Sequence, residues 1–303
     1  MISMQERYRG TMLGLACGDA LGGPVEFMKR KEIVEKFPEG LRDFVGGGWL
    51  HLYPGEITDD TQLTLALAGA LDESGVNGDL LSSNFLKWYD SGPKDIGNTT
   101  RAALHALKHG SPWREAGEKG VEGRPIGSGA ANGGVMRCAP VALRFRNDPE
   151  QMVQASLETA MITHAEERAK WGTVVVNQAL VHLLNGGDRA ETIDASLAGI
   201  SNEELRRSVR AVPEMRSEDV RAGGFVIETI QAAFWSLLKS PSAEEAIITA
   251  VAFGQDADTT GAVIGALAGA HWGAQSLPTR WTEKVQYRDD LIGHADRLLS
   301  LAG

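Results

Sequence analysis

Two short acidic clusters in this chain have the residue types and the spacing to bind metal ions. The first is the run TDDT at 58–61, and the second is the run DADTTG at 256–261. Each cluster stands directly before an apolar stretch with helical spacing, so we expect each to form the first turn of a helix. If the fold brings the two turns together, their four carboxylates need compensating cations, because like charges raise each other's pKa. Oxygen ligands without a nearby Cys or His favour magnesium or manganese over zinc.

Helix capping is the simpler explanation of each cluster taken alone. Asp and Thr are preferred N-cap residues, and acids in a first helical turn are stabilised by the helix dipole. The acid pair, however, occurs twice, and one carboxylate is enough to satisfy a cap, which leaves the second in surplus. At the level of residue types both interpretations, cap and metal site, stay open.

Composition excludes some classes of protein. The 40 acidic residues outnumber the 30 Lys and Arg, giving a formal net charge of -10 that argues against binding to nucleic acid phosphates. The apolar run 12–17 is too short for a membrane span and is followed at once by Asp19, so we expect no integral membrane segment. Cys17 and Cys138 stand beside small apolar neighbours, as buried reduced thiols do. We therefore expect a cytoplasmic protein.

The apolar positions recur with a period near 3.6, which predicts an all-α fold. The 303 residues could form one large domain or two, but no Pro/Ser-rich linker divides them, so we expect a single compact domain over 1–303. The predicted helices span 7–21, 61–73, 79–88, 99–109, 149–163, 166–184, 190–197, 202–212, 224–238, 242–253, 260–272 and 282–301.

Three glycine-bearing loops separate the predicted helices, at 46–49, 95–99 and 127–134. None has the spacing of a phosphate-binding loop of nucleotide triphosphatases. Glycine loops that precede helices can nevertheless bind a diphosphate through free N–H groups, although simple turns are an equally good explanation of each loop. Trp49, in the first loop, could stack on adenine, contact a partner protein or pack in the core. The small residues over 261–270 indicate close packing between helices.

Taken together, the motifs resemble those of the ADP-ribosylglycohydrolase family in order and spacing, over nearly the whole chain. These motifs are GDALG at 18–22 followed by Glu26, TDDT at 58–61, NGGVMR at 132–137, Thr163-His164, and DADT at 256–259. Within the family the chain is most similar to the branch linked to nitrogenase. That likeness comes from GGGWL at 46–50, Pro54-Gly55, DIGNT at 95–99 and the run GGF at 223–225.

The resemblance implies a compact all-helical domain with a cleft that holds two divalent cations, Mg²⁺ or Mn²⁺. Glu26 resembles a glutamate that lies beside the metals as ligand or base, and Asp59 and Asp95 complete the implied catalytic set. The implied metal ligands are Thr58, Asp59, Asp60, Asp256, Asp258 and Thr259. The implied substrate-binding residues are Asp95, Asn98, Ser128, Gly129, Asn132, Gly133 and His164. A lone histidine such as His164 is otherwise more often a polar link between helices.

The implied activity is hydrolysis of the N-glycosidic bond between ADP-ribose and a modified protein side chain, with arginine the favoured linkage. Such a reaction needs a stabilised oxocarbenium-like centre, an activated water and a protonated leaving group. The expected partners are ADP-ribose and an ADP-ribosylated protein, which in the nitrogenase-linked branch would be dinitrogenase reductase, and the expected state is a monomer. Three alternatives stay open: a non-catalytic ADP-ribose binder or structural protein, a hydrolase of serine-, acyl- or nucleic-acid-linked ADP-ribose, and a dimetal phosphohydrolase.

Overall fold

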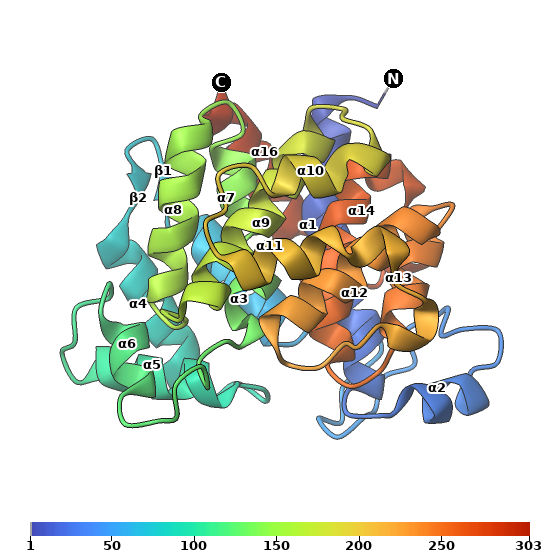
Figure 1. Cartoon of the computed structure of the whole chain (residues 1–303), viewed down its shortest axis with the longest axis horizontal. Helices are drawn as coiled ribbons and strands as arrows, with labels where there is room; N and C mark the ends of the chain where they lie inside the picture. The colour runs from blue at the N-terminus through green and yellow to red at the C-terminus, as the bar shows by residue number, and fades with distance from the viewer. Residues whose placement is uncertain (1) are drawn as a thin grey trace.

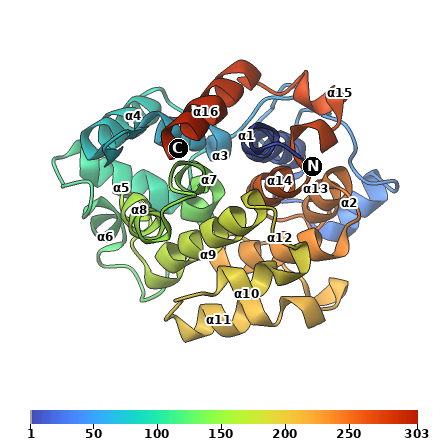
Figure 2. The ribbon, with the colours of Figure 1, turned by 90° about the horizontal axis from the view of Figure 1, so that it is seen from above.

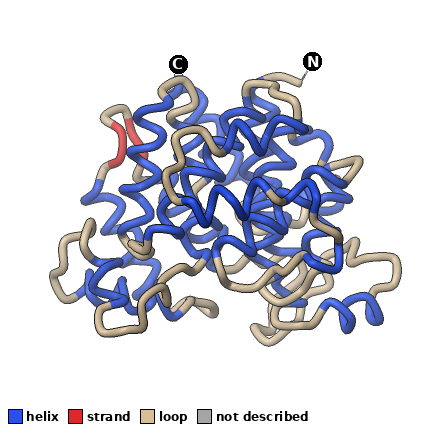
Figure 3. The backbone as a smooth tube through the Cα atoms, in the orientation of Figure 1, coloured by secondary structure: helices blue, strands red, loops and turns tan. Residues whose placement is uncertain are grey.

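The computed structural model describes residues 2–303 as a bundle of helices joined by loops (Figures 1 and 3). The α-helices are α1 (Met4–Gly22), α2 (Arg30–Lys36), α3 (Asp59–Gly69), α4 (Gly78–Asp90), α5 (Asn98–Lys108), α6 (Ala116–Val121), α7 (Ala139–Arg144), α8 (Pro149–Met161), α9 (Glu167–Leu184), α10 (Thr192–Ser196), α11 (Glu203–Arg210), α12 (Val226–Lys239), α13 (Ala243–Val251), α14 (Ala257–Trp272), α15 (Thr279–Thr282) and α16 (Arg288–Ala302). Short 3-10 helices occur at η1 (Gly23–Val25), η2 (Asn132–Arg137), η3 (Arg189–Glu191), η4 (Val212–Glu214), η5 (Ser217–Asp219) and η6 (Ala274–Ser276).

The prediction of an all-α fold is confirmed. Over residues 2–303 the strands amount to one small hairpin, in which β1 (Leu71–Asp72) pairs antiparallel with β2 (Gly75–Val76). This hairpin corrects the predicted helix 61–73, which ends four residues earlier. The Asp72 carboxylate accepts hydrogen bonds from the Ser74 N–H and hydroxyl, at 2.8 and 2.6 Å, and so closes a turn instead of continuing the helix.

The other predicted long helices are present, with ends displaced by a few residues. The predicted helix 282–301 is wrong at its start, because Tyr287 adopts a left-handed backbone conformation with φ of 58° and separates α15 from α16. The sequence did not reveal α2, α6 and α7. These helices have at most seven residues each, about two turns, which is too short for an apolar period to show.

Two helices, α1 and α14, run antiparallel through the middle of the molecule with their backbones almost in contact. Glycine faces glycine at three levels: Gly10 with Gly269, Gly14 with Gly265, and Gly18 with Gly261. A Cβ atom added to any of these glycines would collide with the carbonyl oxygen of the opposite one. The expected close packing over 261–270 is therefore confirmed. It brings the end of α1 directly against the start of α14, where the second acidic cluster lies.

The remaining helices surround this pair. Figure 2 shows α1 and α14 side by side, with α12 and α13 on one side and α3, α7 and α16 on others. Most buried apolar side chains form one continuous cluster, and a small second cluster contains Val220, Ala222, Ala232 and Phe253. Cys17 and Cys138 are both buried free thiols. Within the described part of the chain, no helix has the length and apolar character needed to cross a membrane.

Candidate active site

The first acidic cluster begins α3, as predicted, but the helix is capped by a residue from elsewhere. Asp19, near the end of α1, is fully buried and accepts hydrogen bonds from the Thr58 and Thr61 backbone N–H groups at 3.0 and 3.1 Å. It also accepts from the hydroxyls of both threonines, at 2.8 and 2.5 Å. Burial raises the pKa of Asp19 to about 6, although these four donors oppose the shift. Asp19 thus satisfies the N–H groups that a helix start leaves unpaired.

This arrangement corrects the expectation that one acid of the pair would serve as the cap. Asp59 and Asp60 occupy the first turn of α3 without capping it, and both are buried. The Oδ1 atom of Asp60 has no hydrogen-bond partner among the described residues. A buried carboxylate oxygen without a partner is costly unless a cation or another donor reaches it. Both carboxylates are therefore in surplus, which weakens the simple capping explanation.

The second acidic cluster begins α14, and its side chains also have functions other than capping. Asp256 occupies the N-cap position, but its Oδ2 atom accepts from the side-chain amide of Asn132 at 2.9 Å and caps nothing. Asp258 is 2% exposed, and its Oδ1 atom accepts from the Thr259 N–H at 2.9 Å. The glycine contacts between α1 and α14 place this turn beside Gly22, four residues before Glu26.

The two clusters line one cavity of about 110 Å³. Ten of the residues predicted to form the site face it: Glu26, Asp59, Asp95, Asn98, Asn132, Gly133, His164, Asp256, Asp258 and Thr259. Thr58 and Asp60 are buried but do not line it. Ser128 and Gly129 line a different cavity, of about 370 Å³, with residues of α6 and the loop that follows. The structure thus brings together most of the predicted site and leaves these two glycine-loop residues outside the cavity.

Three carboxylates in the cavity are close enough to share a cation. One oxygen each from Glu26, Asp95 and Asp258 lies within 4.8 Å of the other two. The family resemblance implied a common site for Glu26 and Asp95, catalytic candidates, and for Asp258, a candidate ligand, whereas the short distances between their oxygens are a finding of the fold. All the candidate metal ligands are carboxylate oxygens, which suit hard divalent cations. The Asp60 oxygen without a hydrogen-bond partner would also be stabilised by a nearby positive charge. The residues present therefore fit a divalent cation centre.

Burial and mutual repulsion make these acids hard to ionise. Desolvation, followed by the charge of Asp95, raises the pKa of Glu26 to about 8. Desolvation, followed by the charge of Asp256, raises the pKa of Asp95 to about 6. Loss of solvent also raises the pKa of three other acids far above the usual range for aspartate: Asp59, Asp60 and Asp258. Such clusters of shifted carboxyls in a cavity are typical of catalytic or metal-binding sites.

Another part of the lining contains a histidine held by a buried arginine. Arg137 is 1% exposed, and its guanidinium donates to the Gly133 carbonyl and, at 2.6 Å, to the Thr163 hydroxyl. The Thr163 oxygen lies 2.7 Å from Nδ1 of His164. Gly133 is needed beside the ring, because a Cβ atom there would approach the His164 Cε1 atom to 2.5 Å. His164 is therefore both a polar link and a residue that lines the cavity.

The hydrogen bonds assign one form of His164. Desolvation, followed by the charge of Arg137, lowers the pKa of His164 to about 3, so its ring is neutral. Arg137 can only donate to Thr163, and among the described residues Nδ1 is the acceptor left for the Thr163 hydroxyl proton. We therefore assign the ring proton to Nε2. This leaves His164 as a fixed neutral hydrogen-bond donor.

Asp19 and Arg137 support the site from outside the cavity, and both stand in motifs quoted above without a function of their own. Each has a visible signal, since each is a single charged residue inside an apolar or small-residue run, at 12–22 and 135–143. Long charged side chains are rarely buried without partners, so such a residue in a core helix indicates a buried polar network.

Trp49 contacts the site from the first glycine loop. Its indole Nε1–H donates to Oε2 of Glu26 at 2.6 Å. The ring is 50% exposed, so the interpretation of Trp49 as a core residue is wrong. The three glycines before it all have positive φ, between 65° and 89°, a backbone path that other residues rarely follow.

Comparisons with known proteins identify the family of this chain. The family model of ADP-ribosylglycohydrolase matches residues 2–303. The chain is 33% identical to the ADP-ribosyl-[dinitrogen reductase] glycohydrolase of Rhodospirillum rubrum, over 99% of this chain and 98% of that protein. It is 30% identical to the ADP-ribosylarginine hydrolase Tri1 of Serratia proteamaculans, over 98% of this chain and 80% of that protein.

A solved structure gives the same result at the level of the fold. A chain of an ADP-ribosylglycohydrolase-related protein complex superposes with a TM-score of 0.84 and 32% sequence identity, and the match covers 99% of both chains. The family predicted from the motifs is thereby confirmed: this chain belongs to the ADP-ribosylglycohydrolase family.

Proposed function

We propose that this protein is a hydrolase that releases ADP-ribose from a modified protein side chain, with arginine as the linkage. The observation that carries the proposal is the convergence of Glu26, Asp95 and Asp258, from three distant segments, in a cavity also lined by His164. Family membership supports the hydrolase class. The names of two relatives, one acting on dinitrogen reductase and one on ADP-ribosylarginine, support a protein substrate and the arginine linkage.

The proposal includes two divalent cations, Mg²⁺ or Mn²⁺, held by the acidic part of the cavity. Their ligands would come from Thr58, Asp59, Asp60, Asp256, Asp258 and Thr259, with Glu26 and Asp95 close enough to contribute. When bound, such cations would neutralise the buried carboxylates, bind hydroxyl oxygens of the substrate and make water a better nucleophile. Asp19 supports this centre indirectly, because it caps α3 and leaves Asp59 and Asp60 free.

The side chains of the protein itself would position the substrate and move protons. Glu26 and Asp95 both line the cavity and lie within reach of each other, so one can serve as general acid and the other as general base. An arginine guanidinium leaving group is attracted to this acidic surface. His164 would donate its Nε2 proton to an oxygen of ADP-ribose, beside Asn132 and Gly133.

The rest of ADP-ribose must lie outside the acidic cavity, because about 110 Å³ is small compared with the roughly 300 Å³ or more of a usual ligand site. The neighbouring cavity lined by Ser128 and Gly129 has about 370 Å³. We propose that it takes part of the nucleotide, with the exposed Asn98 between the reacting bond and solvent.

The decisive experiment measures release of ADP-ribose from arginine-, serine- and acyl-linked ADP-ribosyl peptides, with Mn²⁺, with Mg²⁺ and with a chelator. We expect release from the arginine peptide alone, and only with a divalent cation. Release from the serine or acyl peptide instead would show that the enzyme cleaves that linkage and not the arginine linkage. Formation of AMP and ribose phosphate would indicate a phosphohydrolase, and binding of ADP-ribose without any release would indicate a non-catalytic binder.

A further inference from the structure

Exposed apolar side chains are concentrated on one segment of this protein. Among residues 2–303, nine large apolar side chains are strongly exposed, and five of them lie between residues 27 and 53. Three of the five are aromatic: Phe27 is 67% exposed, Trp49 50% and Tyr53 76%. We call these three residues the aromatic rim. Single exposed apolar residues are ordinary, but a group of aromatic ones usually marks a binding surface.

Two residues of the aromatic rim, Phe27 and Trp49, are joined to the acidic cavity through Glu26. Trp49 is hydrogen-bonded to Glu26, which lines the cavity, and Phe27 follows Glu26 and packs on Trp49 with 5.4 Å between ring centroids. At the other end, the Tyr53 ring lies 5.5 Å from the ammonium nitrogen of Lys94, the residue before Asp95. Phe27 and Trp49 thus lie close to Glu26, and Tyr53 is connected through Lys94 to the segment that carries Asp95.

The backbone holds Phe27 outward in a conformation that a phenylalanine rarely adopts. Its φ is 64°, in the left-handed region. Two hydrogen bonds fix this segment against the chain before α14: the Phe27 N–H donates to the Gln255 carbonyl at 2.6 Å, and the Gln255 N–H donates to the Met28 carbonyl at 2.8 Å. A strained backbone conformation that is kept by its surroundings often belongs to a functional surface.

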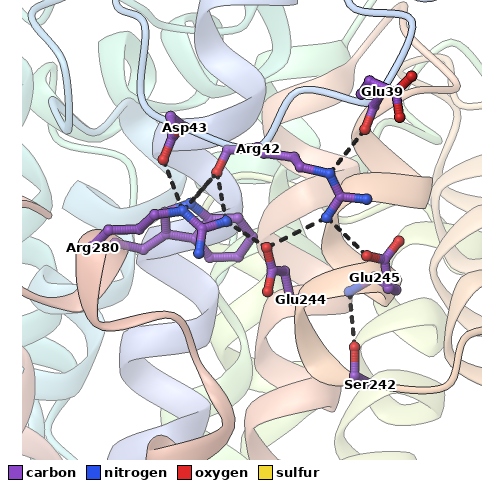
Figure 4. A network of polar contacts seen from close by, with 8 residues as sticks. Glu39, Arg42, Asp43, Ser242, Glu244, Glu245 and Arg280 are labelled. Carbon is purple, nitrogen blue, oxygen red and sulfur yellow. Dashed lines mark hydrogen bonds and ion pairs between the residues drawn. The ribbon is translucent and has the colours of Figure 1, made fainter.

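The loop that carries Trp49 and Tyr53 is also anchored before it reaches the rim. Figure 4 shows Arg42 and Asp43 joined to α13 and α15. Arg42 pairs with Glu245 at 2.8 Å, and Arg280 pairs with Asp43 at 2.7 Å. The indole N–H of Trp281 donates to the Arg42 carbonyl at 2.7 Å. These contacts hold residues 42 and 43 against the helices, and a surface that is ordered before binding loses less entropy when a partner binds.

We propose that the aromatic rim is the docking surface for the polypeptide that flanks the modified side chain. The inference rests on the proposed function. A side chain that reaches Glu26 and Asp95 in the cavity brings its own polypeptide across Phe27, Trp49 and Tyr53. Aromatic side chains are favoured at such contacts, because each buries a large area and orders few rotatable bonds. A second copy of the chain is a poorer occupant, since it would obstruct the cavity that the substrate must enter.

The test compares two substrates that share the reacting bond. One is ADP-ribosyl-arginine as a small molecule, and the other is a folded protein carrying ADP-ribose on one surface arginine. The variants are Tyr53→Ser, Phe27→Asn and the double variant, because asparagine tolerates the left-handed backbone of residue 27. Trp49 is left unchanged, since it contacts Glu26. Ile2→Ser is the matched control: Ile2 is 40% exposed, precedes α1 and does not line the acidic cavity.

We expect the double variant to raise KM for the modified protein about tenfold, with kcat unchanged. The kcat and KM of the double variant on ADP-ribosyl-arginine should stay within about twofold of the parent values. For Ile2→Ser, kcat and KM on both substrates should also stay within about twofold. An unchanged KM for the protein would overturn the proposal. An equal loss on both substrates would also overturn it, because the rim would then support the site or bind the nucleotide. A parent dimer that the double variant dissociates would identify a second copy as the occupant. No release by the parent from either substrate would refute the proposed function itself, and the docking surface with it.

Discussion

The two parts of the cavity lining treat buried charge in different ways. In the acidic part, carboxylates crowd together and their pKa values rise, and Asp60, which is buried outside the lining, has one oxygen without a partner among the described residues. In the histidine part, the chain from Arg137 through Thr163 to His164 satisfies its own hydrogen bonds. The acidic part therefore needs positive charge from solution, whereas the histidine part is a neutral ring held in place by protein groups, with its Nε2–H left as a donor. Divalent cations should therefore change the stability contributed by the acidic part but not the stability contributed by the histidine part.

The largest expected effect comes from removing one acid. Asp258→Ala should lower turnover of ADP-ribosyl-arginine at least about a thousandfold and abolish divalent cation binding in a calorimetric titration. In chelator, however, the variant should be more stable than the parent by roughly 1–3 kcal/mol, because a buried charge is lost. Asp79→Ala is the matched control, since Asp79 is an exposed acid in the first turn of α4. Equal turnover by the two variants would show that Asp258 is not part of the active site.

Removal of the buried guanidinium of Arg137 should have the opposite effect on the free energy of unfolding from removal of Asp258. Arg137→Met leaves the Gly133 carbonyl without its guanidinium donor and frees Thr163 from its arginine partner, so we expect a loss of about 2–4 kcal/mol in the free energy of unfolding. The loss should be the same with Mg²⁺ and with chelator in urea denaturation. A loss that appears only in the presence of the cation would show that the two parts of the lining are coupled.

Cation binding should stabilise the folded protein through the acidic part alone. At a free Mn²⁺ or Mg²⁺ concentration about a hundred times the dissociation constant, the expected gain is about 2.7 kcal/mol. Differential scanning calorimetry should show this gain in the parent and in Arg137→Met but not in Asp258→Ala. A gain of the same size in Asp258→Ala would place the cation elsewhere.

The smallest effect is a pH dependence that belongs to His164. Its pKa is about 3 in the folded protein, against about 6.5 in the unfolded chain, so the unfolded state binds the proton first. Stability due to the neutral ring is therefore complete above pH 6.5 and is lost as pH falls toward 3, by at most about 1.4 kcal/mol per pH unit. The measurement is the difference in unfolding free energy between the parent and His164→Gln at pH 7.5, 6 and 5, in chelator. A difference that does not change with pH would mean that the ring is not buried as a neutral donor.

The parts of the fold and site that were predictable from sequence depend on local signals. The starts of α3 and α14 were predictable because Thr and Asp residues precede apolar helical periods, although the side chains of Thr58 and Asp256 make no capping hydrogen bond. Short helices such as α7, and the left-handed Tyr287 that ends the run before α16, carry no comparable signal.

The features of the site that were not predictable depend on contacts between residues far apart in the chain. Asp19 caps a helix that begins 40 residues later, and Arg137 acts on His164 through a third residue. Asp95 joins Glu26 and Asp258 only because loops far apart in the chain meet. Sequence motifs placed Ser128 and Gly129 with the rest of the site, while the backbone directs them to the next cavity.

The glycine contacts between α1 and α14 set the distance between Glu26 and Asp258 in discrete steps. Glycines meet every four residues, so the next register that avoids a collision lies about 6 Å away, at 1.5 Å of rise per residue. A slide by one to three residues would bring a Cβ atom against the opposite backbone at these levels, so the contact disfavours it. Adjustment of the site on binding must therefore occur in the loops, and the loop with Trp49 is in contact with Glu26. The two helices keep their relative positions.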